Sequence, residues 1–167
     1  MRVISSGIVN GEIQDQYGKR GTQFNEYGVP SCSLPFEVLD APEGTRSFAI
    51  ILEDKDAIPV TNGFPWIHWV ACNIRRTRVS ENESQGTPDF VQGLNSYTSL
   101  QGGSLPKEAC CCYCGMGAPD CPHLYELHVF ALDTVLPLCQ GFWMNELWKA
   151  MKGHILDSDT LEGLYKN

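Results

Sequence analysis

The sequence predicts an all-β fold, a β-sandwich of two antiparallel or mixed sheets with helices at the C-terminal end. Apolar segments rich in β-branched and aromatic residues recur along the chain, and glycine and proline separate them. Apolar side chains at helical spacing occur only near the end of the chain. No internal repeat or linker divides the sequence, so residues 1–167 are predicted to form a single domain.

The strands are predicted in chain order, short ones first and long ones later. The first part of the chain is interrupted by glycine and proline so often that only short strands fit, within 7–13 and 33–39. Residues 80–120 are polar and turn-rich, and they predict long loops with at most one short strand. Longer strands, buried on both faces, are predicted at 47–52, 66–72 and 124–132.

Two helices are predicted after the last long strand. Apolar residues three or four apart over 143–151 predict one amphipathic helix of about three turns, which Gly153 is placed to end. Its tryptophans and methionines are predicted to pack in the core. The acidic run 157–159, followed by Glu162, predicts a second, shorter helix, because negative side chains favour a helix N-terminus.

The charge balance and the cysteine count limit the class of protein. The chain has 12 Lys+Arg and 20 Asp+Glu, a formal net charge of −8, which has the wrong sign for nucleic acid or an anionic membrane surface. No transmembrane segment or signal peptide is found, which predicts a cytoplasmic protein. In that compartment the eight cysteines are predicted to be free thiols. The oligomeric state is open, with a homodimer among the alternatives.

Three pairs of side chains suggest a binding site, namely Asp54/Asp56, Trp66/His68 and His123/Tyr125. Residues two apart on an extended strand share a face. If the pairs converge near the strand ends, imidazoles and a tyrosine hydroxyl supply donors, carboxylates orient the imidazoles, and a tryptophan forms an apolar wall. Gly115 and Gly117 would let backbone N–H groups approach an oxyanion. This pattern predicts a pocket for phosphate or carboxylate.

Several of these residues also have a structural interpretation. A histidine beside a tryptophan in a strand is more often a hydrogen-bonded core residue, which applies to His68. Asp54 and Asp56 can form a turn with their own backbone. His128 and His154 have no patterned partner and are predicted to be structural.

Metal-based chemistry is a weaker alternative. Cys111 and Cys114 have C-x-x-C spacing, and Cys121 or His123 could complete a tetrahedral zinc site. Structural zinc usually uses two separated pairs, whereas these residues crowd one loop, so no metal and no cofactor is predicted. A centre of His68, His123 and Asp54 is the remaining alternative, for a metal-dependent or His/Asp hydrolase. No nucleophile motif is present, and no catalytic residue is assigned.

Two long blocks of the sequence resemble the phosphatidylethanolamine-binding protein (PEBP) family, in its bacterial Raf-kinase-inhibitor-like branch. The block EDKDAIPVTNGFPWIHWVACNI, residues 53–74, resembles the family's D-P-D-A-P stretch and the W-x-H-W strand that follows it. The block YCGMGAPDCPHLYELHVFALD, residues 113–133, resembles the Y-x-G-P-x-P-P loop, H-R-Y and a strand ending A-L-D. The flanks 42–47 and 151–165 agree with the family as well.

The resemblance implies a β-sandwich with a C-terminal helical portion and a pocket for phosphate-like anions and phospholipid head groups. On this basis the chain is predicted to be a non-enzymatic binding protein. The family's eukaryotic members suggest an alternative, a regulator or inhibitor of a kinase or protease that acts through protein contact. The residues implied to line the pocket are Asp54, Asp56, Trp66, His68, Tyr113, Gly115, Gly117, Pro119, His123 and Tyr125.

The sequence departs from the family's pattern around this pocket. These departures are Lys55, Ile58, Met116, Ala118 and Leu124. They leave open which head group the pocket would prefer. The cysteine-containing segment 100–112 lies outside the family's pattern, and a lid, an oligomer contact and a redox-sensitive loop are its candidate roles.

Overall fold

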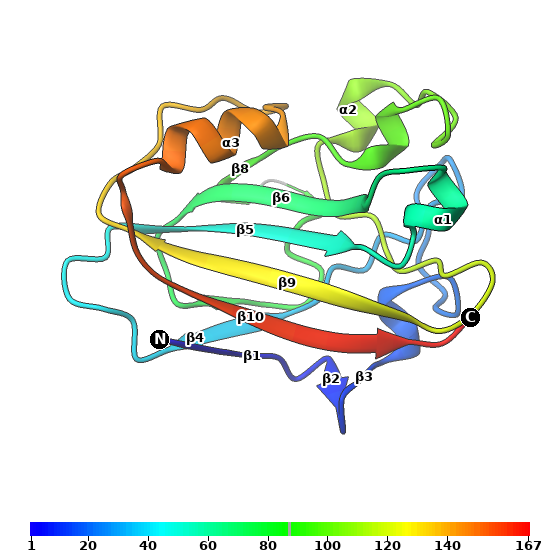
Figure 1. Ribbon diagram of the computed structural model, residues 1–167, viewed down its shortest axis with the longest axis horizontal. Helices are drawn as coiled ribbons and strands as arrows, with labels where there is room; N and C mark the ends of the chain where they lie inside the picture. Colours follow the sequence, from blue (N-terminus) through cyan, green and yellow to red (C-terminus); the bar gives the residue numbers. More distant parts are fainter. Residues whose placement is uncertain (87) are drawn as a thin grey trace.

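The computed structural model describes residues 1–86 and 88–167, and it forms two sheets that face one another (Figure 1). The smaller sheet has the order β1-β4-β7, from β1 (Arg2–Ile4), β4 (Phe36–Leu39) and β7 (Arg78–Val79). The larger sheet has the order β2-β3-β10-β9-β5-β6-β8. Its pairs are antiparallel except for β10 with β3, so the predicted sandwich with a mixed sheet is confirmed.

The strands of the larger sheet carry most of the core. The long strands predicted from apolar runs are all present and extend one or two residues further, as β5 (Ser47–Asp54), β6 (Trp66–Ile74) and β9 (His123–Leu132). The others are β2 (Ile8–Val9), β3 (Glu12–Ile13), β8 (Val91–Gln92) and β10 (Ile155–Tyr165).

Burial on both faces of β5 follows from the two layers that cover the larger sheet. Ile50 and Leu52 point toward the smaller sheet and form the main core with Trp69 of β6. Ala49 and Ile51 point the other way, into a second core beneath helix α3 (Met144–Met151). Because successive side chains of a strand face opposite ways, a strand between two apolar layers needs a continuous apolar run.

Helix α3 confirms the predicted amphipathic helix, although it is shorter than expected. Its eight residues make about two turns, and Gly153, with φ +83°, lies in the turn that follows. Leu147 and Met151 are fully buried, whereas Trp143 and Trp148 are 43% and 46% exposed. The expectation that the tryptophans pack in the core is therefore wrong, because Trp143 precedes the helix and Trp148 lies at the margin of its buried side.

The second predicted helix is wrong, since residues 155–165 form strand β10. Asp157 and Asp159 are half-buried and alternate with exposed residues, which is the period of a strand. The whole segment pairs with β9, with Gly163 opposite Tyr125, and Asp159 Oδ2 accepts a hydrogen bond of 2.6 Å from Val3 N. Sheet pairing over eleven residues outweighs the local preference of an acidic run for a helix start.

The remaining loops hold short helices. They are η1 (Asp15–Tyr17), α1 (Ile58–Thr61), η2 (Ser96–Thr98) and α2 (Lys107–Cys110), and β8 is the short strand within the long loop region. Figure 1 shows α1 and α2 near the C-terminal end of β5 and α3 above the other end of the sheet. Among the described residues, no helix has the length and apolar character needed to cross a membrane.

Candidate functional site

The candidate site lies where three strand ends meet. Strand β5 lies between β9 and β6 and is antiparallel to both, so its C-terminal end meets the N-terminal ends of its neighbours. In this register Asp54 is opposite Trp66 on one side and Tyr125 on the other. The convergence expected from the spaced pairs is thus produced by the sheet topology.

A cavity of about 250 Å³ opens at this end of the sheet. Most of the residues implied by the resemblance line it, namely Asp54, Trp66, His68, Gly115, Gly117, Pro119 and Tyr125. The structure adds lining residues that the sequence patterns do not indicate, namely Ala57, Val60, Thr61, Tyr97 and Gln101. A cavity of this size suits a small group rather than a large cofactor.

His68 presents a hydrogen-bond acceptor to the cavity while its ring is neutral. Its Nδ1 lies 2.8 Å from the carbonyl oxygen of Cys114, which only accepts, so Nδ1 carries a proton and donates. The neutral ring then has an unprotonated Nε2. Desolvation is the largest effect on the pKa of His68 and lowers it, although Asp54 and the Cys114 carbonyl act in the opposite direction.

Tyr125 lines the same cavity as a protonated phenol. Its hydroxyl oxygen accepts hydrogen bonds of 3.2 Å from the backbone N–H groups of Gly117 and Ala118, so its own proton is left to donate. Desolvation raises the pKa of Tyr125, and the charge of Asp54 and a side-chain hydrogen bond with it add to the effect. The phenol therefore stays protonated at neutral pH, and Asp54 competes with a ligand for its proton. The rings of Tyr125 and His68 pack edge to face, with centroids 5.1 Å apart.

Asp54 is buried and is held from two sides. Its Oδ1 accepts a hydrogen bond of 3.1 Å from Ala57 N, and its Oδ2 lies 2.8 Å from Nδ1 of His123. The backbone turn expected for Asp54 and the pairing with histidine are therefore both present. The Ala57 contact orients the start of α1, which brings Val60 and Thr61 to the cavity.

His123 supports the cavity wall instead of lining it. Its side chain is 1% exposed, and its Nε2 lies 2.9 Å from Asp120 Oδ1. Desolvation opposes protonation of this ring and is the largest single effect. Asp54 and Asp120 together outweigh it and raise the pKa of His123.

Asp56 and Tyr113 also lie outside the lining of the cavity. Asp56 is exposed, and its Oδ2 accepts a hydrogen bond of 2.9 Å from Leu124 N, which ties the end of β5 to the start of β9. Tyr113 is buried in the main core, where its ring contacts Trp69 edge-on at 5.7 Å. Its hydroxyl donates a hydrogen bond of 2.6 Å to Tyr17 O.

The backbone N–H groups of Gly115 and Gly117 are engaged inside the protein, contrary to the expected role at an oxyanion. Gly115 N donates to Pro30 O at 2.8 Å and Gly117 N donates to Tyr125, so neither N–H is free for an oxyanion. A Cβ at Gly115 would lie 2.6 Å from Tyr17 O, so close packing excludes a side chain there. A Cβ at Gly117 would meet no atom within 4 Å.

The residues that sequence reasoning missed come from loops that tertiary packing brings to the strand ends. The ring of Tyr97, in η2, packs edge-on against Trp66 with centroids 5.3 Å apart. Ile67 N donates a hydrogen bond of 2.8 Å to Ser96 Oγ, which anchors η2 to β6. No short motif marks Tyr97 or Gln101, so only the fold identifies them.

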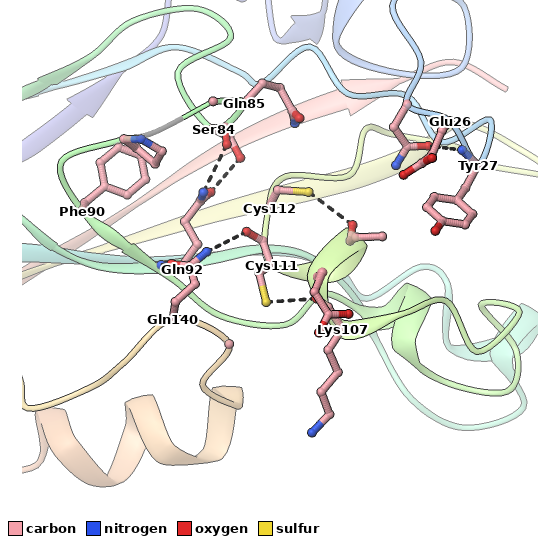
Figure 2. Close-up of a pocket in the computed structure, with 16 residues that line it drawn as sticks. Glu26, Tyr27, Ser84, Gln85, Phe90, Gln92, Lys107, Cys111, Cys112 and Gln140 are labelled. Carbon is pink, nitrogen blue, oxygen red and sulfur yellow. Dashed lines mark hydrogen bonds between the residues drawn. The ribbon is translucent and has the colours of Figure 1, made fainter.

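A larger hollow of about 940 Å³ lies away from this site, beside the cysteine run (Figure 2). The Cys111 thiol donates to Lys107 O at 3.0 Å and the Cys112 thiol to Ala109 O at 3.4 Å. Burial raises the pKa of both thiols, that of Cys112 to about 11. The lowered pKa that a redox-responsive thiol needs is thus not found at these two positions.

The alternative metal sites suggested by the sequence are not assembled. Cys111 lines the larger hollow, Cys114 is buried with its Sγ 3.7 Å from Nδ1 of His68, and Cys121 is exposed. In the described part of the chain, these thiols form no cluster with one another, and His68, His123 and Asp54 form none either. The ligand atoms of Cys121 and His123 instead lie together with Asp120.

Comparisons with known proteins agree over nearly the whole chain. A family model described as "Phosphatidylethanolamine-binding protein" matches residues 4–166. The chain is 40% identical over 157 residues to the uncharacterised protein YxkA of Bacillus subtilis, which covers 92% of this chain and 93% of that protein. It is 34% identical over 137 residues to a UPF0098 protein of Chlamydia muridarum, covering 80% and 82% of the two chains.

Solved structures show the same architecture. A structure described as a putative phosphatidylethanolamine-binding protein homologue from Chlamydia trachomatis superposes with a TM-score of 0.79 at 28% identity, covering 99% of this chain and 96% of that one. YbcL of E. coli, described as a new member of the mammalian PEBP family, superposes with a TM-score of 0.75 and covers 99% and 98%. At 23% identity, the second likeness concerns the fold alone.

Proposed function

The chain belongs to the phosphatidylethanolamine-binding protein family, and on that premise we propose that it is a non-enzymatic binding protein for small anionic groups. The ligand would be a phosphate, a carboxylate or a phospholipid head group. The observation that carries this proposal is that Asp54, His68 and Tyr125 face one cavity of about 250 Å³ walled by Trp66.

The side chains of the cavity suit an anion that brings a proton or acquires one at the site. Tyr125 donates a hydrogen bond in its neutral form, whereas neutral His68 has an accepting Nε2. An unprotonated oxyanion would therefore meet one donor, which Asp54 also engages, one acceptor and the Asp54 carboxylate. Protonated His68 would donate a hydrogen bond from Nε2 to the anion. Alternatively, a hydroxyl group of the ligand would donate a hydrogen bond to the neutral Nε2.

Binding, rather than covalent catalysis, is supported by the state of the thiol beside His68. Cys114 is buried, and desolvation raises the pKa of its thiol well above the usual range. A thiol that stays protonated at neutral pH is a weak nucleophile. Its contact with His68 therefore supports a structural role for Cys114.

The proposal is tested by calorimetric titration of inorganic phosphate, acetate and phosphoethanolamine into the full chain at several pH values. We expect saturable binding of at least one of the three, weakened about tenfold or more in His68→Gln. Because the pKa of free His68 is lowered, the ring is neutral at pH 7, and anion binding favours its protonated form. Affinity should therefore rise as the pH falls below about 7, with proton uptake on binding.

A matched control is His154→Gln, because His154 is exposed and pairs with Asp133 away from the cavity. This variant should bind as the unaltered chain does. Failure of all three probes to bind at any pH from 5 to 8 would refute the anion pocket. Equal affinities of His68→Gln and the unaltered chain would remove His68 from it.

A further inference from the structure

A second group of potential ligands lies on the loop that enters β9, next to the pocket but outside its lining. Asp120, Cys121 and His123 each offer one ligand atom, and these atoms all lie within 4.8 Å of one another. The side chain of His123 is 1% exposed, whereas Asp120 and Cys121 are exposed. The group thus combines one buried, fixed side chain with two that are free to adjust toward a bound ion.

The orientation of His123 is the one that metal sites use. Its Nδ1 faces the buried Asp54 carboxylate at 2.8 Å, and its Nε2 faces Asp120 at 2.9 Å. A carboxylate hydrogen-bonded to one ring nitrogen holds the imidazole in place and makes the other nitrogen a better ligand. Asp54 has this supporting position, so Nε2 is directed at the place where Asp120 and Cys121 meet.

The charge around the three residues favours a cation. Asp54 and Asp120 contact the two ring nitrogens of His123, and Asp56 Oδ2 lies 2.9 Å from Leu124 N, so three carboxylates surround the start of β9. Lys55, which stands between Asp54 and Asp56 in the sequence, is engaged by Glu126 at 2.6 Å. A divalent ion would neutralise this excess and displace the protons of the thiol and of Nε2.

We propose that Asp120, Cys121 and His123 form a three-residue zinc site whose fourth position is open to solvent. The mixed nitrogen, oxygen and sulfur set suits Zn²⁺, which takes four ligands at about 2.0–2.3 Å. Two ligand atoms of a tetrahedral Zn²⁺ lie about 3.3–3.8 Å apart. Ligand atoms that already lie within 4.8 Å of one another therefore need only small rotations of the exposed Asp120 and Cys121 side chains. This inference goes beyond the proposed function, because Zn²⁺ is bound whether or not the pocket binds an anion.

A second cluster in the structure provides the contrast. Glu53, Glu126 and His128 also place their ligand atoms within 4.8 Å of one another. Lys55 Nζ already lies 2.6 Å from Glu126 and 3.5 Å from Glu53, so a cation of the protein itself neutralises these carboxylates. We therefore expect this cluster to bind Zn²⁺ much more weakly.

The experiment titrates Zn²⁺ alone into the reduced, chelator-treated full chain in competition with a chromophoric chelator. About one strongly bound Zn²⁺ per chain is expected, weakened at least tenfold in Cys121→Ser and in Asp120→Asn. Co²⁺ serves as a spectroscopic probe, because a Cys121 thiolate ligand produces a sulfur-to-metal charge-transfer band that Cys121→Ser must lose. Both substitutions are at exposed positions, so the variants should fold normally.

Matched controls decide which residues hold the ion. Cys139→Ser removes the other exposed cysteine, and Glu126→Gln disables the second cluster; both should leave Zn²⁺ affinity unchanged. Zinc binding that survives Cys121→Ser and Asp120→Asn but is lost in Cys111→Ser or Glu126→Gln would overturn the proposal. So would the absence of a charge-transfer band in the unaltered chain loaded with Co²⁺.

Discussion

Asp54 connects the pocket, the turn after β5 and the buried histidine. One carboxylate oxygen accepts from Ala57 N and the other faces His123, so both are engaged inside the protein. A buried carboxylate is stable only with such partners, because desolvation of an unpaired charge costs several kcal/mol. The position of Asp54 in the lining of the pocket thus depends on two contacts behind the lining.

Asp54→Asn should destabilise the protein by about 2–4 kcal/mol, because it removes the charge that two buried donors require. Urea unfolding at pH 7 measures the free energy of unfolding. Asp133→Asn is the control, since Asp133 pairs with His154 at the same 2.8 Å but both side chains are 46% exposed. That change should cost less than about 1 kcal/mol. Equal losses in the two variants would contradict the burial argument.

Among the elements, α3 shows how packing creates a short helix. Eight residues are too few for a stable helix in water, so α3 depends on the sheet face that it covers. Leu147 and Met151 contribute its buried side, against Ile51, Val70 and Phe130. Trp148 lies at the margin, half exposed, with its ring 5.2 Å from that of Phe130.

Leu147→Ala should therefore destabilise the protein by about 3 kcal/mol, through lost burial and the cavity left in the second core. Trp148→Ala removes a larger side chain but should cost less, because Trp148 is 46% exposed and Leu147 fully buried. Thermal or urea unfolding of both variants measures the difference. A greater loss for Trp148→Ala would show that Trp148, at the margin of α3, has a structural role that its exposure does not indicate.

In the molecule as a whole, the two apolar cores share the larger sheet. Strands β5, β6 and β9 each place alternate side chains in the main core and in the core beneath α3. Loss of either core therefore disrupts the packing of the other, which predicts one cooperative unfolding transition. Within the described residues the cysteines are all free, so this cooperativity does not depend on disulfides.

The exposure of the thiols predicts how the intact protein reacts with an aromatic disulfide reagent. Cys121 and Cys139 are exposed and should react first, whereas Cys32, Cys72 and Cys114 are buried and should react only on unfolding. Denaturant should make all eight thiols reactive. A reductant should leave the midpoint of thermal unfolding unchanged; a fall of several degrees would reveal a disulfide that this structure does not contain.

Much of the fold was predictable from the sequence because apolar runs and turn formers act locally. The runs over 47–52, 66–72 and 124–132 became β5, β6 and β9 since a strand covered on both faces has to be apolar throughout. The segment 155–165 was not predictable in this way. Its acidic start favours a helix locally, and only pairing with β9 makes it a strand.

The sequence by itself determined the chemistry available to the pocket, because Asp54, His68 and Tyr125 stand at strand ends with the spacing that puts side chains on one face. Only the tertiary structure decided which groups reach the cavity. It placed His123 behind Asp54 and Tyr113 in the core, and it brought Tyr97 in from a loop. Strand register and loop packing depend on contacts between residues far apart in the chain, which local spacing does not encode.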